Sequence, residues 1–193
     1  DGGSVTASNQ ISVQSHVAIH EVNAKVGGNA VSSVIVVSGV EVERHTDRKI
    51  LAWLRRQERL GYEIGALCTG AYFLARAGLL DGYNCTLHWE NLPGFREVFP
   101  DINATDDLFE IDRNRFTCSG GMASLDMMLH LVRLQHGSDL AAKISDQCIV
   151  DRIRGEEDHQ RIPASVRFGI YHPKLLNAIR LMEGNLEEPL NLD

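Results

Sequence analysis

The hydrophobic and polar positions alternate between two patterns near the start of the chain. The segment Ala30 to Gly39, AVSSVIVVSG, is rich in β-branched residues and ends in Ser-Gly. A run of this kind predicts a strand buried on both faces of a parallel sheet. The next segment, HTDRKILAWLRRQERLG, has apolar residues at helical spacing. It predicts a helix that Thr46 or Asp47 caps and that Gly61 ends.

The same alternation repeats immediately downstream. YEIGAL predicts a second buried strand, and TGAYFLARAG predicts a second helix that ends at Gly78. Strands and helices that alternate through short connections are typical of right-handed βαβ units. We therefore expect an α/β fold with a mainly parallel sheet.

Shorter elements follow in the middle of the chain. NCTLH predicts a short strand, and NLPGFREVF predicts a short helix that Pro100 stops. INATDD, LFEIDRN and RFTCSGG predict three further strands, the last two joined by a tight turn at Asp112 to Asn114.

Two longer helices are expected after the glycine pair Gly120-Gly121. MASLDMMLHLVRLQHG is amphipathic and ends at Gly137, and SDLAAKISDQCIVDRI begins with Ser138 as a predicted N-cap. The predicted apolar stripe of the first helix consists of Met122, Leu125, Met128, Leu129 and Val132.

The last part of the chain differs from what precedes it. RGEEDHQRIPASVRFGIYHP is polar and irregular, which is typical of an arm or linker. HPKLLNAIRLMEGN then predicts a helix with Pro173 at its first position and Gly184 near its end. We expect a domain over residues 1–154, an arm over 155–171 and the start of another domain over 172–193.

Composition limits the class of protein. With 193 residues, 44% of them hydrophobic and 23% charged, the chain suits one compact domain with a small appendage. A formal net charge of -7 leaves no basic surface of the kind that binds phosphates, so this part alone is a poor nucleic-acid binder. We find no apolar run long enough for a membrane span and no signal peptide, and we expect a cytoplasmic protein.

The cysteines show no metal-binding pattern. Their spacing is wide and uneven, without a CxxC pair or a Cys/His arrangement typical of zinc sites. We expect free thiols, and neither a metal nor another cofactor. The four are Cys68, Cys85, Cys118 and Cys148.

Cys68 is the main candidate for chemistry. It lies where a predicted strand turns into a helix, with small residues such as Gly65 and Gly70 around it. A nucleophile elbow needs this pattern because the turn is tight. The amino end of the following helix would lower the pKa of the Cys68 thiol. The alternative is a buried structural cysteine, and we favour the reactive elbow.

Two further positions could complete a site. His88 follows Cys68 by one helix and one strand, which returns the chain to the same edge of the sheet. Imidazole and thiol could meet there, although a histidine that caps a loop is equally consistent with the spacing. Ser38 and Gly39 end the first strand and could offer N–H groups as an oxyanion hole, but a simple turn is the commoner explanation.

Aromatic and acidic residues lie near these positions in the sequence. Trp89 and Tyr72 could line a pocket and face a cationic ligand, although aromatic residues so placed are more often core. No spacing fixes an acidic third member of a triad. The candidates are Glu90, Asp106, Asp107 and Glu110.

Several motifs together resemble a known family. GALCTGAYFLARAGLLDG, CTLHWEN, DDLFEIDRNRFTCSGG and HPKLLNAIRLMEGNLEEPLNLD occur in this order from Ser38 onward. The chain resembles AraC-type transcriptional regulators that carry an N-terminal class I glutamine amidotransferase-like, or PfpI-like, domain.

The resemblance implies a flavodoxin-like three-layer sandwich that senses a small metabolite, with DNA bound by a C-terminal pair of helix-turn-helix motifs. The final helix resembles the start of that DNA-binding domain. The family normally opens with a βα unit before the first residues present here, so we expect that unit to be missing. Such regulators usually act as homodimers on promoter DNA. The resemblance suggests an amino-acid-like or quaternary amine metabolite as the effector of this chain.

The resemblance also maps onto the site. Cys68 matches the elbow cysteine of the superfamily, and His88 matches the histidine that follows it in the regulators. Thr69 stands where PfpI-type proteases have a catalytic histidine, and the HPE-like motif of true amidotransferases is absent. These departures weaken an enzymatic interpretation.

The favoured hypothesis is therefore a ligand-sensing domain with a degenerate active-site cleft. A cysteine hydrolase or amidotransferase that uses Cys68 and His88 ranks second, and a thiol redox sensor ranks third. The expected ligand-binding residues are Ser38, Gly39, Cys68, Thr69, Tyr72, His88 and Trp89.

Overall fold

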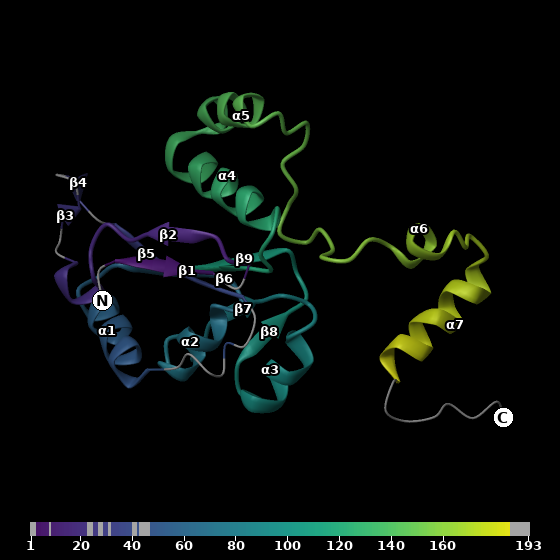
Figure 1. The fold of residues 1–193 in the computed structure, drawn as a ribbon. Helices are drawn as coiled ribbons and strands as arrows, with labels where there is room; N and C mark the ends of the chain where they lie inside the picture. The colour runs from purple at the N-terminus through teal and green to yellow at the C-terminus, as the bar shows by residue number, and fades with distance from the viewer. Residues whose placement is uncertain are drawn as a thin grey trace.

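The central sheet has four strands and is mainly parallel. The computed structural model describes residues 3–7, 9–22, 25–26, 29–30, 32–39, 42 and 47–185. The strand order is β5-β6-β10-β9; β5, β6 and β10 run parallel, and β9 is antiparallel to β10 (Figure 1). The α/β class with a mainly parallel sheet is confirmed. The sheet strands are β5 (Ser33–Ser38), β6 (Glu63–Cys68), β9 (Phe109–Asp112) and β10 (Arg115–Cys118).

Helices cover both faces of this sheet (Figure 1). On one face lie α1 (Arg48–Arg59), α2 (Ala71–Arg76) and α3 (Leu92–Val98). On the other lie α4 (Ala123–His136) and α5 (Ser138–Gln147). A separate parallel pair consists of β7 (Asn84–Thr86) and β8 (Asn103–Thr105).

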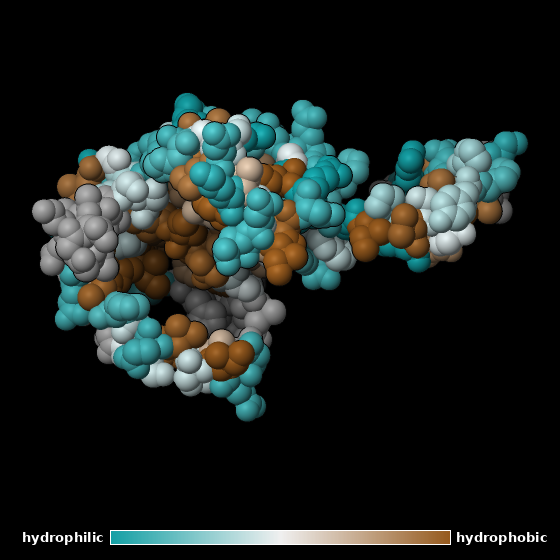
Figure 2. Space-filling model, turned by 90° about the horizontal axis from the view of Figure 1, so that it is seen from above, coloured by the Kyte–Doolittle hydropathy of each residue, from teal (hydrophilic) through white to brown (hydrophobic). Residues whose placement is uncertain are grey.

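The remaining elements are short or lie outside this body. The first residues form antiparallel pairs that the sequence analysis did not predict, β1 (Ser4–Thr6) with β2 (Ser12–Gln14) and β3 (Lys25–Val26) with β4 (Asn29–Ala30). A 3-10 turn, η1, spans Ile19–Glu21. After the body, the arm contains α6 (Ala164–Phe168) and leads to α7 (Pro173–Gly184), which projects to one side (Figures 1 and 2).

The alternation of side chains along β6 explains why there are two apolar clusters. Ile64 and Ala66 pack with α2 and α3 residues on one face, whereas Leu67 packs with Phe116 and Cys118 on the other. On this second face, Ile35 and Val37 of β5 remain 38% and 72% exposed. Seen from above, apolar side chains line a hollow in the body (Figure 2).

The predicted helix ends are mostly correct. The Asp47 side chain caps α1 by accepting a hydrogen bond of 2.8 Å from the Lys49 backbone N–H. Gly61 follows α1 with φ +86°, and Gly78 follows α2 with φ +69°, both in the region that favours glycine. Ser138 is the first residue of α5 and not its cap, because the cap position belongs to Gly137.

The predicted apolar stripe of α4 was wrong at two positions. Met122 is 63% exposed and Met128 is 40% exposed, whereas Asp126 and Met127 are buried. The buried face of α4 combines the pair between Asp126 and Arg154 with the packing of Ala123 and Met127 into the cluster around Phe109. Among the helices described, none is long and apolar enough to cross a bilayer.

Candidate functional site

Cys68 lies at a strained strand-to-helix turn. It is the last residue of β6, pairs in register with Ser38 of β5, and has φ +58°. A non-glycine residue in this conformation costs free energy and is found where the surrounding structure requires it, often at functional sites. The predicted elbow geometry is thus present.

Two glycines allow backbone segments to pack closely around the elbow at Cys68. A Cβ on Gly70 would collide with the backbone carbonyl oxygen of Val36. Gly120 has φ +94°, and a Cβ there would lie 2.8 Å from the Cys68 Cβ. The loop after β10 therefore packs directly against the side chain of Cys68.

The predicted lowering of the thiol pKa was wrong. Cys68 is half-buried, and loss of hydration raises the pKa of its thiol. The Thr69 backbone N–H acts in the opposite direction but has a smaller effect, and the nearby Cys118 and Glu90 raise the pKa further. Desolvation therefore outweighs the N–H groups at the start of the next helix, and the neutral thiol is favoured.

His88 makes its polar contacts with Glu90. Its Nδ1 atom accepts from the Glu90 backbone N–H at 3.4 Å and lies 3.7 Å from the Glu90 Oε2. None of the hydrogen bonds between described residues joins His88 to Cys68, so a ready thiol–imidazole pair is not assembled. Of the four acidic candidates, Glu90 is the one that contacts His88 in the described part of the chain.

Thr69, the residue after the elbow cysteine, is hydrogen-bonded to Ser38 and Gly39 at the end of β5. The Thr69 backbone N–H donates to the Ser38 carbonyl at 3.3 Å, and its hydroxyl donates to the Gly39 carbonyl at 2.5 Å. Thr69 is 2% exposed. These contacts use carbonyl oxygens, which repel an anion, so they give no support to the predicted oxyanion hole.

Tyr72 belongs to the core. It is 5% exposed, and its ring packs edge-on against Phe95 at 5.0 Å between centroids. Its hydroxyl donates to the Asn91 carbonyl at 3.3 Å. The prediction that Tyr72 lines a ligand pocket is not supported, because α2 turns this side chain toward α3.

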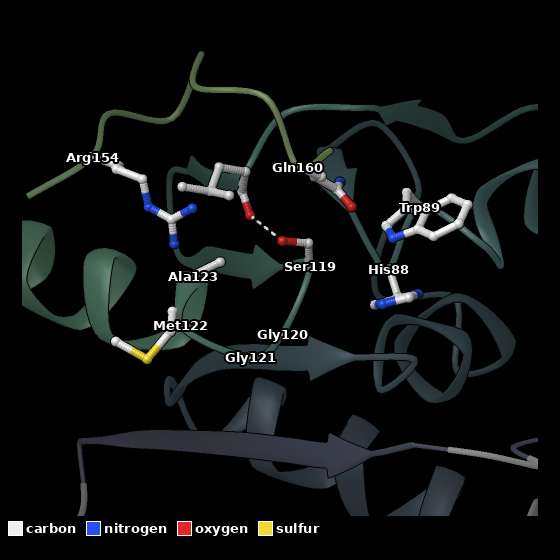
Figure 3. A pocket seen from close by; sticks show the side chains of 10 residues that line it. His88, Trp89, Ser119, Gly120, Gly121, Met122, Ala123, Arg154 and Gln160 are labelled. Carbon is white, nitrogen blue, oxygen red and sulfur yellow. Dashed lines mark hydrogen bonds between the residues drawn. The ribbon is translucent and has the colours of Figure 1, made fainter. Parts of the chain in front are cut away.

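A cleft of about 200 Å³ lies beside the elbow (Figure 3). His88 and Trp89 line it as predicted, and Gly120 separates it from Cys68. Ser38, Gly39, Thr69 and Tyr72 are not part of its lining. The lining consists of His88, Trp89, Leu108, Ser119, Gly120, Gly121, Met122, Ala123, Arg154 and Gln160.

One side of this cleft carries an ion pair whose carboxylate is buried. The Arg154 guanidinium lies 2.6 Å from the Asp126 Oδ2, and the Arg154 backbone N–H donates to Oδ1 at 3.0 Å. The amino end of α4 also faces the cleft through Met122 and Ala123, and no side chain caps it. The first N–H groups of α4 donate to backbone carbonyls of the preceding turn. The donors left for an anionic group of a ligand are therefore the guanidinium N–H groups of Arg154 that Asp126 does not use.

Gln160 offers an acceptor on the other side. Its amide nitrogen donates to the Thr86 hydroxyl and to the carbonyls of Leu87 and Asp107, at 2.8 to 3.1 Å. Its Oε1 atom is buried and has no hydrogen-bond partner among the described residues. Figure 3 shows this oxygen on the side that faces His88 and Trp89. A ligand that donates a hydrogen bond or carries positive charge would satisfy it.

The profile of the DJ-1/PfpI family matches residues 1–134. The chain belongs to the DJ-1/PfpI family. It is 52% identical over 164 residues to the HTH-type transcriptional regulator GbdR of Pseudomonas aeruginosa, covering 85% of this chain and 45% of that protein. It is 43% identical over 190 residues to the regulator CdhR of the same species, covering 98% of this chain and 55% of that protein.

A solved structure agrees with these sequence relationships. The crystal structure of an AraC family transcriptional regulator from Pseudomonas putida has a TM-score of 0.62 and 25% identity, and covers 77% of each chain. The resemblance to AraC-type regulators with a PfpI-like domain is confirmed. The chain spans about half the length of the curated relatives it matches.

Three features of the site in this DJ-1/PfpI chain were not predicted from the sequence. Arg154 and Gln160 come from a polar segment whose pattern gave no sign of a fixed position. Cys118 packs near Cys68 only because β10 pairs with β6. Gly120 was visible as part of a glycine pair, which was the one available signal. Within the described ranges, no group of three or more His, Cys, Asp or Glu residues could hold a metal ion.

Proposed function

We propose that this chain is the ligand-sensing part of an AraC-type transcriptional regulator. In this proposal, a small metabolite binds in the cleft beside Cys68 and controls DNA binding by a C-terminal helix-turn-helix domain. The observation that carries the proposal is the position of the arm. Arg154 and Gln160 form part of the cleft, and the chain then leads to α7. The similarity to GbdR and CdhR supports it.

The chain would be divided accordingly. Residues 1–154 would form the sensor, of the flavodoxin-like three-layer type, 155–171 the arm, and 172–193 the start of the DNA-binding domain. The DJ-1/PfpI match ends at residue 134, whereas the similarity to CdhR covers 98% of the chain. The arm and α7 are thus shared with a regulator even though they lie outside the family match.

The charges around the cleft suit a ligand with both signs of charge. The guanidinium N–H groups of Arg154 that Asp126 does not use would receive a carboxylate, and the free oxygen of Gln160 would face an ammonium group. The Trp89 ring adds a surface for a cation. We therefore propose an amino-acid-like or quaternary amine effector.

A contact at the rim offers a mechanism for the response. The Arg161 guanidinium lies 4.4 Å from the centroid of the Trp89 ring. A ligand cation that occupied this ring would displace Arg161 and loosen the arm. Occupancy would then favour a different arrangement of the arm and α7, which is what a ligand-driven switch requires.

A cysteine hydrolase or amidotransferase remains the second candidate, because the φ of +58° at Cys68 is the strain expected of a nucleophile. The raised pKa of its thiol and the engagement of His88 with Glu90 favour the sensor. They argue equally against a thiolate redox sensor. The full regulator would act in the cytoplasm as a homodimer on promoter DNA.

A thermal-shift screen of the full-length protein with amino-acid-like and quaternary amine metabolites tests the proposal. A ligand at one hundred times its Kd would stabilise the fold by about 2.7 kcal/mol. Gln160→Leu should reduce this shift, whereas the control Gln147→Leu, at the exposed end of α5, should leave it unchanged.

Two results would contradict the sensor. One is the absence of any stabilising ligand together with a measurable turnover of amides that is lost in Cys68→Ala, which would establish the hydrolase. The other is preferential oxidation of Cys68 by peroxide near neutral pH that alters promoter binding.

A further inference from the structure

A second cavity, of about 340 Å³, lies where the arm and α7 meet the domain. Arg161 and Arg167 of the arm and Arg180 and Glu183 of α7 line it, together with Trp89 from the domain. Three parts of the chain that are far apart in sequence therefore contribute to one site. It is distinct from the cleft described above, although Trp89 lines both.

The cations of this cavity outnumber the carboxylates that pair with them. Arg167 donates to the Glu183 Oε1 at 2.8 Å, and the Arg161 guanidinium lies 3.5 Å from the same oxygen. Arg180 has no ion pair with any described residue. Asp106 also lines the cavity but is exposed and pairs with none of these arginines in the described part of the structure.

One donor in this cluster is buried and unsatisfied. The Nε atom of Arg167 has no hydrogen-bond partner in the described structure. A buried donor of a charged group without an acceptor costs free energy, so the cluster is incomplete as it stands. Guanidinium groups present several N–H donors in a plane, a geometry that fits the paired oxygens of carboxylates and phosphates.

We propose that this cavity binds a small oxyanion, a carboxylate or phosphate group, through Arg167 and Arg180. The anion accepts from the free Nε of Arg167 and from the unpaired guanidinium of Arg180. Because Arg167 belongs to α6 and Arg180 to α7, a bound anion holds these two helices together. The site does not depend on the identity of an effector in the cleft.

Isothermal titration of the full-length protein with inorganic phosphate, and separately with succinate, tests the site at constant ionic strength. We expect saturable binding of at least one of the two, weakened at least tenfold in Arg180→Gln. Arg56→Gln, on the exposed side of α1, is the matched control and should bind as the unchanged protein does. Binding of phosphate alone identifies a phosphate site, and binding of succinate alone or of both identifies a carboxylate or general oxyanion site.

Limited trypsin digestion supplies a second measurement that does not depend on the heat of binding. The bound anion should slow cleavage at Arg161 and Arg167 in the unchanged protein but not in Arg180→Gln. The proposal is overturned if neither anion binds saturably, or if Arg56→Gln and Arg180→Gln weaken binding equally.

Discussion

The two sides of the cleft are held by different forces. On the elbow side, Ala71 and Leu74 of α2 are fully buried, and backbone geometry fixes Cys68. On the arm side, Ile162 and Phe168 are 61% and 52% exposed, and the positions depend on polar contacts. Segments with few buried apolar contacts open at lower free energy than the core. The cleft thus combines one rigid side with one that a ligand can move.

We expect the largest loss of stability from a substitution on the elbow side, at Gly120. Gly120→Ala forces a Cβ against Cys68 in a left-handed conformation, and we expect a loss of about 2–4 kcal/mol in the free energy of unfolding. Gly121→Ala is the control, since φ is +55° there but nothing lies within 4 Å. Urea unfolding measures both, and equal losses would show that the contact with Cys68 does not matter.

The arm side can be tested at Asp126. Asp126→Ala removes the partner of Arg154, which is about one-third exposed, and we expect a loss of about 1–3 kcal/mol. Arm cleavage by protease should also become faster. The control is Arg152→Ala, which breaks the exposed pair with Asp158 but keeps the hydrogen bond from the Gly155 backbone N–H to Asp158, and should change protease sensitivity little. Unaltered cleavage in Asp126→Ala would mean that other contacts hold the arm.

The chemistry of the elbow is tested by the rate of thiol alkylation. Burial raises the pKa of Cys68, so its thiolate fraction at neutral pH is small, whereas Cys148 is exposed. We expect iodoacetamide to modify Cys68 several times more slowly than Cys148 at pH 7, because Cys68 is both less accessible and less often a thiolate.

The pH profile of this reaction has a definite direction. Because the folded-state pKa is raised, the rate at Cys68 should keep rising with pH beyond the range where an ordinary thiol levels off. The associated stability is present below the ordinary thiol pKa and is lost as pH rises toward the folded-state value. Peptide mapping by mass spectrometry separates the labelling of Cys68 from that of Cys148. Faster labelling of Cys68 than of Cys148 at pH 7 would support the hypothesis that Cys68 is a reactive nucleophile.

The smallest expected effect concerns Tyr72. Tyr72→Phe removes the hydrogen bond to the Asn91 carbonyl and should lower the free energy of unfolding by about 0.5–1.5 kcal/mol, measured by thermal unfolding. Because this side chain lies in the core and not in the cleft, the thermal shift caused by an effector should be unaltered. A smaller thermal shift with the effector in Tyr72→Phe would indicate that Tyr72 contributes to the ligand site after all.

Much of the fold was predictable because it depends on local patterns. The β-branched run before Ser38, the cap at Asp47 and the glycines after α1 and α2 each have a local physical cause. The pair of β1 and β2 was missed because short exposed strands have no buried face and so leave no periodic signal. The α4 stripe was misplaced because the face that the helix buries depends on Arg154 and on the core cluster around Phe109, which only the folded chain brings to it.

The sequence by itself determined the class of fold, the elbow at Cys68 and the resemblance to AraC-type regulators. The tertiary structure decided that the Cys68 thiolate is disfavoured, that Tyr72 is core, and that Arg154 and the arm residue Gln160 line the cleft. The physical reason is that helix caps and apolar periods act over a few residues. Desolvation and long-range pairing depend on groups that only the folded chain brings together.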